Sequence, residues 1–283
     1  MFKEIKPKSE ILKEYILSYN LLTEGSQFPF SYFAFPHTYN ILTFFNHANI
    51  ETGQNELTLS SNINQVFQIV VLGRYVLPLK IKYIDFVPEI SINFKPIAIN
   101  HFFDIPFNAF ATKNIQKIDV SDWLSISKKI FIADADKTIA LLEEFLLSKM
   151  KIKPLQQLQN AIEILEEDDT IEISELAKRT NQTERTLSRY FKLYAGCSPS
   201  VYKRISRFRK SIDLKYLNNK NLNCTDICFS NSFYDTAHFR KEFRRLTNQN
   251  PKEFFDTLSL VGEGHYPLSS FKDCLICTTG IIS

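Results

Sequence analysis

Two segments of the chain, TERTLSRYFKLYAGCSPSVY (183–202) and DTAHFRKEFRRLTNQNPKEF (235–254), share one pattern of apolar and basic residues. With an offset of 52 residues their apolar and proline positions coincide: Leu187 with Phe239, Phe191 with Phe243, Pro199 with Pro251, and Tyr202 with Phe254. A repeat of about 50 residues is typical of a supersecondary unit that has been duplicated. The C-terminal part must therefore fold as two similar units.

Capping residues divide each copy into two helices separated by a turn. In the first copy, Thr183 can cap a helix that ends at Gly196, because glycine tolerates the left-handed conformation. In the second copy, Asp235 and Asn248 take the capping and terminating positions. The sequence predicts a helix-turn-helix in each copy, with a long helix over about 199–217 between them.

The second helix of each copy also carries a polar and basic face opposite its apolar residues. The positions at i, i+3, i+4 and i+7 hold Arg185, Ser188, Arg189 and Lys192 in the first copy, and Ala237, Arg240, Lys241 and Arg244 in the second. Arginine forms paired hydrogen bonds to guanine in the major groove, and Lys and Arg neutralise phosphates. A face selected only for solubility would mix acids with bases. The pattern favours DNA contact over a solvated surface.

Basic residues are concentrated in the C-terminal part, although the net charge of the chain is only +3. Residues 178–252 hold 17 Lys and Arg against 5 Asp and Glu, so this segment alone carries a charge of 17 − 5 = +12. Residues 163–175 hold seven acids and no base. This asymmetry predicts a polyanion-binding domain joined to a different domain. A solvated basic surface is the alternative explanation.

The N-terminal half has the pattern of a β-rich domain. Residues 32–110 contain short runs rich in β-branched and aromatic residues, which favours an antiparallel sandwich or barrel. From Asp119 the apolar period changes to 3.6 residues and predicts two helices with a break near 134–136. We expect an α+β chain with three parts: a β-rich sensor or dimerisation domain over 1–150 that includes a helical hairpin at about 120–150, an all-α double helix-turn-helix domain over 151–260, and an unassigned tail over 261–283.

The C-terminal part resembles the AraC/XylS family of bacterial transcription regulators. The resemblance covers roughly 155–258 and rests on ISELAKRTNQTERTLSRYFKLYAGCSPSVYKRISRFRKS and DICFSNSFYDTAHFRKEFRRLTNQNPKEF. The second stretch follows a family signature in which an Ile-Ala pair precedes Gly-Phe, Ser-His-Phe and a late Gly-x-x-Pro. It departs from that signature at Cys228, Ser232, Ala237 and Asn248, all small or turn-tolerant residues. The N-terminal part resembles, more weakly, the cupin-like barrel with a helical dimerisation hairpin of some of these regulators.

The resemblance implies that the two units enter successive major grooves of double-stranded DNA, roughly 34 Å apart. By position it implies base-reading roles for Arg185, Ser188, Arg189, Thr236, Arg240 and Lys241. It implies phosphate contacts for Lys192 and Arg244, and a structural place beneath the recognition helix for His238. The partners it implies besides DNA are RNA polymerase, which an activator contacts, a small-molecule effector and a second copy of the chain.

Histidines in the β-rich part raise the question of a cupin metal site. His37, His47 and His101 lack the close His-x-His spacing with a following carboxylate that such a site uses. We therefore expect them to be ordinary core or surface residues, and the aromatic residues between 28 and 131 to be core rather than the lining of an effector pocket.

Four of the five cysteines could together supply the thiolates of a zinc site: Cys224, Cys228, Cys274 and Cys277. The CxxC pair lacks the glycine or proline of a zinc knuckle, and Cys228 occupies an expected core position. Reduced, unreactive thiols are the expectation for a cytoplasmic protein, with redox sensing by the CxxC pair as an alternative. We predict no metal, no cofactor and no catalysis.

The sequence therefore predicts a cytoplasmic regulator that binds DNA sequence-specifically and is controlled through its N-terminal domain by a small molecule or by dimerisation. The resemblance implies that this regulator is an activator. No apolar run reaches the ~18 residues that a membrane span needs, and the first residues lack the apolar core of a signal peptide. We expect no membrane contact. Two alternatives stay open: a protein-interaction module that regulates another transcription factor, and a metal-dependent cupin enzyme.

Overall fold

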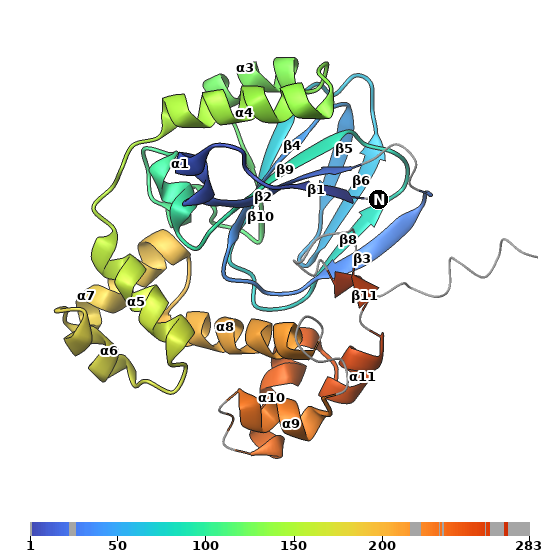
Figure 1. Cartoon of the computed structure of the whole chain (residues 1–283). Coiled ribbons are helices and arrows are strands. Elements are labelled where there is room, and N and C mark those ends of the chain that lie inside the picture. The colour runs from blue at the N-terminus through green and yellow to red at the C-terminus, as the bar shows by residue number, and fades with distance from the viewer. Residues whose placement is uncertain are drawn as a thin grey trace, which may run out of the picture.

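A computed structural model describes residues 2–22, 27–215, 222–231, 233, 235–257, 259–260 and 269–270. In Figure 1 a β-rich N-terminal half is followed along the chain by a helical C-terminal half, and α8 runs beneath the β-rich half. This order confirms the predicted fold class, a β-rich domain followed by a helical one. The predicted tail, apart from two residues, and its cysteines Cys274 and Cys277 lie outside the described residues.

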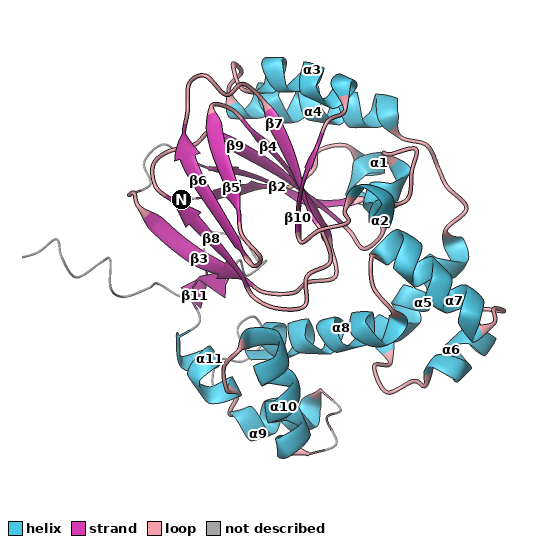
Figure 2. Cartoon of the chain, turned by 180° about the vertical axis from the view of Figure 1, so that it is seen from behind, coloured by secondary structure: helices cyan, strands magenta, loops and turns pink. Residues whose placement is uncertain are grey.

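The strands of the N-terminal half form two sheets that enclose one apolar core (Figure 2). The larger sheet has the order β1 (Phe2–Ile5), β2 (Ile16–Leu22), β9 (Glu89–Phe94), β4 (Asn40–Phe45), β7 (Gln68–Leu72), β10 (Ile115–Ile118). The smaller sheet has the order β3 (Phe30–Ala34), β8 (Leu79–Tyr83), β6 (Glu56–Ser61), β5 (Ala48–Thr52). Within these two sheets β6 and β8 are parallel and the other neighbours are antiparallel.

The central strands of the larger sheet are buried on both faces. In β4, Ile41 and Phe45 point into the core between the sheets, whereas Leu42 and Phe44 point into a second core beneath the helical hairpin. Alternate side chains of a strand face opposite sides, so a strand covered on both sides reads as a nearly continuous apolar run. This explains the ILTFF sequence of β4.

The helical hairpin covers the outer face of the larger sheet (Figure 1). It consists of α3 (Ser121–Ile130) and α4 (Ala135–Lys149). Asp134 starts α4, because its carboxylate accepts a hydrogen bond from the amide of Lys137 at 2.9 Å. The predicted break near 134–136 is confirmed.

Two predictions for the N-terminal half are corrected. The β-structure begins before residue 32, with β1 and β2, whose pairing partners lie far away in the sequence. Residues after β9 do not continue as strands but form η1 (Ala98–His101) and α2 (Phe107–Phe110). Prolines at 96 and 106 remove backbone donors that a sheet ladder would need. A short helix, α1 (Glu10–Lys13), also precedes β2.

The helical half contains two units joined by one long helix (Figure 2). The first unit consists of α5 (Gln156–Glu167), α6 (Ile173–Arg179), α7 (Glu184–Tyr190) and the π-helical turn η2 (Phe191–Ala195). The linking helix is α8 (Pro199–Asp213). The second unit consists of α9 (Cys224–Ser230), α10 (Thr236–Thr247) and α11 (Pro251–Thr257). Two short strands, β11 (Ser259–Leu260) and β12 (Ser269–Ser270), pair after it.

Each unit has its own apolar core. None of the helices in the described part of the chain combines the length and the apolarity that a membrane crossing requires.

Candidate nucleic-acid interface

The first recognition helix is α7 with its continuation η2, and it begins and ends at the predicted capping residues. The Thr183 hydroxyl accepts a hydrogen bond from the amide of Thr186 at 3.1 Å and so starts α7. Leu187 and Phe191 are buried in the core of the first unit. Gly196 follows η2 with a φ of 73°, the left-handed conformation that favours glycine. These local interactions fix which side of α7 faces solvent.

The outward side of α7 presents cations. Arg185, Arg189 and Lys192 are exposed, and Ser188 is half-buried between them. The guanidinium of Arg189 lies 5.3 Å from the centre of the Tyr190 ring. Within the part of the chain that the structure describes, the three cations make no ion pair. They are therefore available to an anionic partner.

The second recognition helix, α10, is capped in the same way. Asp235 accepts a hydrogen bond from the amide of His238 at 2.7 Å, and Asn248 ends the helix with a φ of 60°. Phe239 and Phe243 are buried in the core of the second unit, where the Phe243 ring packs against Phe208 of α8 and Phe254 of α11. The same design thus returns in the second unit, as the repeat predicts.

The basic face of α10 borders open hollows of the surface. Arg240, Lys241 and Arg244 are exposed, and Thr236 is half-buried. Thr236, Arg240 and Arg244 line a cavity of about 730 Å³ between α9, α10 and α11. The six positions predicted to read bases and the two predicted to bind phosphates thus lie on α7, η2 and α10.

The sequence did not predict the exposed Arg245 or the exposed position of His238. Arg245 is exposed and shares a hollow of about 690 Å³ with Lys241 and Arg244. Its position next to Arg244 was the signal that could have found it. His238 was expected beneath the recognition helix, and this is wrong: its side chain is exposed, beside the Phe233 ring at a centroid distance of 5.9 Å. Phe239, the next residue, takes the core position instead.

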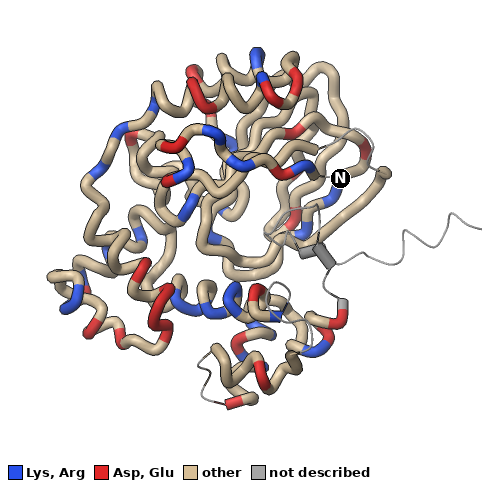
Figure 3. The backbone as a smooth tube through the Cα atoms, viewed as in Figure 1, with Lys and Arg blue, Asp and Glu red and all other residues tan. Residues whose placement is uncertain are grey.

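Many of the basic residues counted in 178–252 are not directed at solvent. Five lie on α8, and each has a partner within the molecule: Lys203, Arg204, Arg207, Arg209 and Lys210. Figure 3 shows the acidic residues around the end of α5 next to the basic residues of α8. Asp169 of the acidic run 163–175 therefore pairs with Arg207 and Lys210 of the linking helix, whereas the cations of α7, η2 and α10 are exposed.

The histidines of the β-rich half sit in different environments. His37 is buried, and its Nδ1 lies 2.8 Å from the carbonyl oxygen of Tyr39. Burial lowers the pKa of His37 well below its usual value, so the ring is neutral. His47 and His101 lie elsewhere, beside the carbonyl of Ile63 and the ring of Tyr15. Among the described residues no three His, Cys, Asp or Glu side chains gather as metal ligands would.

The two cysteines of the second unit that are described lie on α9. Cys228 is buried in the core and Cys224 is half-buried. Burial raises the pKa of both thiols, which disfavours the reactive thiolate.

A family model described as a helix-turn-helix domain matches residues 176–257. The matched range runs from α6 to α11 and contains both recognition helices with the linking helix between them. The C-terminal helices form an AraC-type helix-turn-helix domain. Domains of this AraC type bind DNA in transcription regulators, and the exposed cations of α7 and α10 lie on the helices that such domains place in the major groove. The resemblance predicted from the sequence is confirmed for this part of the chain.

Solved structures of transcription regulators are similar to this chain in outline. ToxT from Vibrio cholerae, in its 1.65 Å structure, is 10% identical, with a TM-score of 0.46 over 84% of this chain and 97% of that one. Wild-type ToxT with a bound unsaturated fatty acid is 12% identical, with a TM-score of 0.44 over 86% and 100%. The regulator CdpR from Pseudomonas aeruginosa is 16% identical, with a TM-score of 0.27 over 62% and 48%.

All three TM-scores are below 0.5, so no functional residue is transferred from these proteins. A search of curated proteins gives no match to this chain.

Proposed function

We propose that this chain is a transcription regulator that binds double-stranded DNA sequence-specifically through α7 and α10. The observation that carries the proposal is the repeated arrangement of the two helices, each with a buried apolar face and an exposed face of cations that form no ion pair with another described residue. An AraC-type helix-turn-helix domain with such faces is suited to the major groove, where an α-helix fits and each base pair presents a distinct pattern of donors and acceptors.

The roles of the side chains follow from their chemistry. We assign base reading to Arg185, Ser188, Arg189, Thr236, Arg240 and Lys241, whose positions lie in the first turns of the two helices. Lys192 and Arg244 lie farther along their helices and are assigned to phosphates, which a single positive charge neutralises without reading sequence. We also propose domain limits of 1–150 and 151–260, because all the proposed DNA contacts then lie in the second domain.

The N-terminal half is proposed to control DNA binding, because it holds the C-terminal half at two places. At the first unit, Asn100 donates to the carbonyl of Tyr194 in η2 at 2.9 Å. At the second unit, the ring of Phe35 packs in the core 5.0 Å from the ring of Phe254. A change in the β-rich half would therefore move both recognition helices.

A small molecule or a second copy of the chain is the proposed source of that change. The interior between the sheets holds a cavity of about 40 Å³ beside the buried polar residues Glu89 and Ser91. This volume suits one or a few waters, so a larger molecule would have to separate the sheets. The α3–α4 hairpin is the proposed dimer surface, and Ile132 at its turn is 86% exposed. The partner for activation is RNA polymerase, and a DNA-bound regulator works in the cytoplasm of a bacterium.

The proposal is tested by selecting bound fragments from random DNA with the purified full chain. We expect two enriched half-sites with centres about one helical turn, or about 10 base pairs, apart. Selection without any enriched motif would overturn the proposal. Association with another transcription factor in place of DNA would then favour a protein-interaction module.

A further inference from the structure

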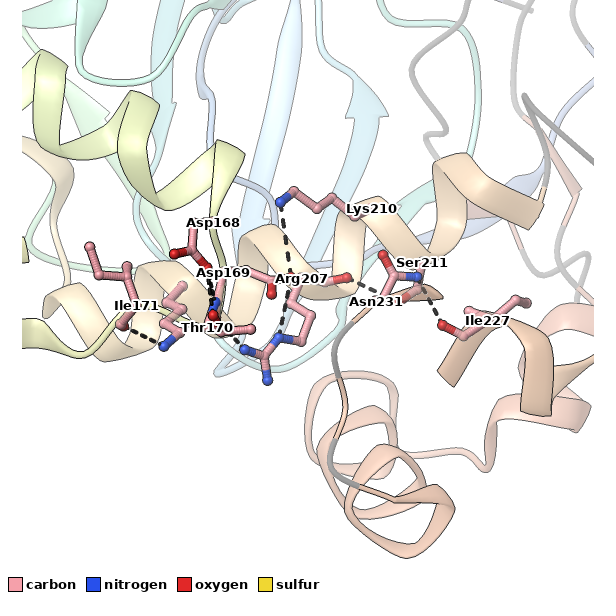
Figure 4. A network of polar contacts seen from close by, with 10 residues as sticks. Asp168, Asp169, Thr170, Ile171, Arg207, Lys210, Ser211, Ile227 and Asn231 are labelled. Atoms are coloured by element: carbon pink, nitrogen blue, oxygen red, sulfur yellow. Dashed lines mark hydrogen bonds and ion pairs between the residues drawn. The ribbon is translucent and has the colours of Figure 1, made fainter. Parts of the chain in front are cut away.

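The linking helix α8 is joined to the first unit through its basic side chains (Figure 4). The Lys203 ammonium donates to the carbonyl of Ile171 at 2.7 Å. Arg207 donates through Nη2 to the backbone carbonyl of Asp169. Arg207 Nε and Lys210 Nζ form ion pairs with the Asp169 carboxylate, at 3.4 Å and 3.9 Å from the same Oδ2 atom. Asp169 lies in the connection between α5 and α6 and is only 5% exposed. A buried carboxylate thus ties α8 to one unit.

A second ion pair joins α8 to the other unit. Arg204 Nε lies 2.9 Å from Glu242 Oε2, and the two side chains are 20% and 17% exposed. Glu242 is the single acid of α10. It lies two residues from both Arg240 and Arg244, which places it about 200° around the helix axis from them. The acid therefore sits on the side of α10 that faces α8, away from the basic stripe.

Arg207 contacts both units at once. Besides its ion pair with Asp169, its guanidinium lies 5.2 Å from the centre of the Phe233 ring. Phe233 lies in the connection between α9 and α10, three residues before α10 begins at Thr236. One side chain of the linking helix therefore connects the α5–α6 connection of the first unit to the turn of the second unit.

These polar contacts are directional, whereas the rest of the interface between α8 and α10 is apolar. The rings of Phe208 on α8 and Phe243 on α10 have their centroids 5.2 Å apart, and such apolar contacts lack the directionality of a hydrogen bond. A guanidinium presents its donors in a fixed planar fork, so its partners must lie in defined directions. Arg204 and Arg207 thus add directional contacts to the packing of the second unit on α8.

We propose that Arg204 with Glu242, and Arg207 with Asp169 and Phe233, are positioning residues that set the spacing of the two DNA half-sites. The proposal rests on the proposed function, since it needs both recognition helices to bind one duplex. Adding one base pair between half-sites moves them apart by about 3.4 Å and turns them by about 35°. A domain whose units are locked in rotation accepts one spacing, and a domain without the lock tolerates several.

The test uses the full chain and DNAs that carry the selected half-sites with the spacer shortened or lengthened by one or two base pairs. The wild-type chain should prefer one spacing by at least about tenfold. Glu242→Gln should reduce that preference by about three- to tenfold, the effect of losing one oriented pair. Its affinity for DNA with a single half-site should stay unchanged, because Glu242 faces away from the DNA.

Matched variants separate positioning from general destabilisation. Glu175→Gln makes the same chemical change in an exposed ion pair with Arg179 that does not join the units, and it should leave the spacing profile unchanged. The exchanged pair Arg204→Glu with Glu242→Arg should restore the preference that Glu242→Gln loses. Arg207→Lys keeps the charge but not the fork, and it should also broaden the profile.

The outcomes are distinguishable. A spacing profile that Glu242→Gln and Arg207→Lys leave unchanged overturns the positioning proposal while the regulator function stands. A wild-type chain that selects no half-sites overturns the proposed function itself. If Glu242→Gln does not fold, Arg207→Lys becomes the test. A spacing preference in Arg207→Lys as strong as that of the wild-type chain would then overturn the positioning proposal.

Discussion

The guanidinium of Arg74, directly after β7, donates to the carbonyl oxygen of Ala195 at the end of η2, with 3.0 Å between Nε and O. The same side chain donates to the backbone carbonyls of His37, Thr38 and Tyr39 in the segment between β3 and β4. The last carbonyls of a helix carry partial negative charge. A cation from the N-terminal half therefore holds the end of the first recognition helix against the β-rich domain.

Replacing Arg74 by alanine is expected to lower the free energy of unfolding by about 2–4 kcal/mol, because several half-buried carbonyls lose a charged donor. Urea denaturation followed by circular dichroism measures this. Arg179→Ala serves as the control, since it removes only an exposed pair with Glu175 and should cost less than about 0.5 kcal/mol. Equal losses in the two variants would show that the contact between the halves has no energetic role.

Phe35 belongs to the N-terminal half but completes the core of the second unit, where it is 1% exposed. Phe35→Ala should therefore cost about 3–5 kcal/mol, the range for a buried aromatic side chain. Phe229→Ala is the matched control, because that ring is 68% exposed on α9 and its loss should change stability by less than about 0.5 kcal/mol. Thermal denaturation of the three proteins compares them. A small effect at Phe35 would mean that the second unit is independent of the β-rich half.

The parts of the fold that local interactions determine could be predicted from the sequence. Thr183, Asp235 and Asn248 stand at the helix limits that they predicted, because a cap involves residues only a few positions apart. The basic faces of α7 and α10 follow from the 3.6-residue period alone. The same holds for the break before α4 at Asp134.

The parts that depend on distant contacts could not be predicted. Whether a cation is exposed or paired depends on what packs against it, so the sequence could not separate Arg240, which is exposed, from Arg204, which is paired with Glu242. The isolated Arg74 and the core role of Phe35 depend on contacts with the other half of the chain. The edge strand β1 likewise needs β2 to form its ladder.

Arg185→Ala and Arg240→Ala should each weaken binding to the selected DNA by about 1–3 kcal/mol and relax base preference at one position. The reason is that a lost guanidinium removes paired hydrogen bonds to one base. Selection of bound sites with each variant measures the change. Lys117→Ala on β10 is the control, since it removes an exposed cation that lies outside both the recognition helices and the α3–α4 hairpin. An unchanged preference with Arg185→Ala would refute the assignment of the reading face on α7.

Lys192→Ala should weaken all DNA sequences alike, because a phosphate contact carries no sequence information. Each neutralised phosphate contributes about 0.9 to the slope of log affinity against log salt concentration, so the slope should become shallower by about one. Titrations at several salt concentrations measure it, on selected and on scrambled DNA. A loss confined to the selected sequence would instead make Lys192 a base-reading residue.

The buried carboxyl of Glu89 makes the stability of the β-rich half depend on pH. Burial raises the pKa of Glu89 from its ordinary value of 4.5 to about 7, although hydrogen bonds from the Tyr83 and Ser91 hydroxyls oppose the rise. Between these two values the folded state keeps a proton that the unfolded chain releases. Stability should therefore fall as the pH rises through this window, by about 3 kcal/mol in total, and level off above it.

Neutral, buried His37 changes stability in the opposite direction below its ordinary pKa of 6.5, but it is present in wild type and variant alike. The difference in unfolding free energy between wild type and Glu89→Gln, measured from about pH 5 to about pH 8, therefore isolates the carboxyl. A difference that does not change with pH would mean that Glu89 is already ionised in the folded protein at low pH.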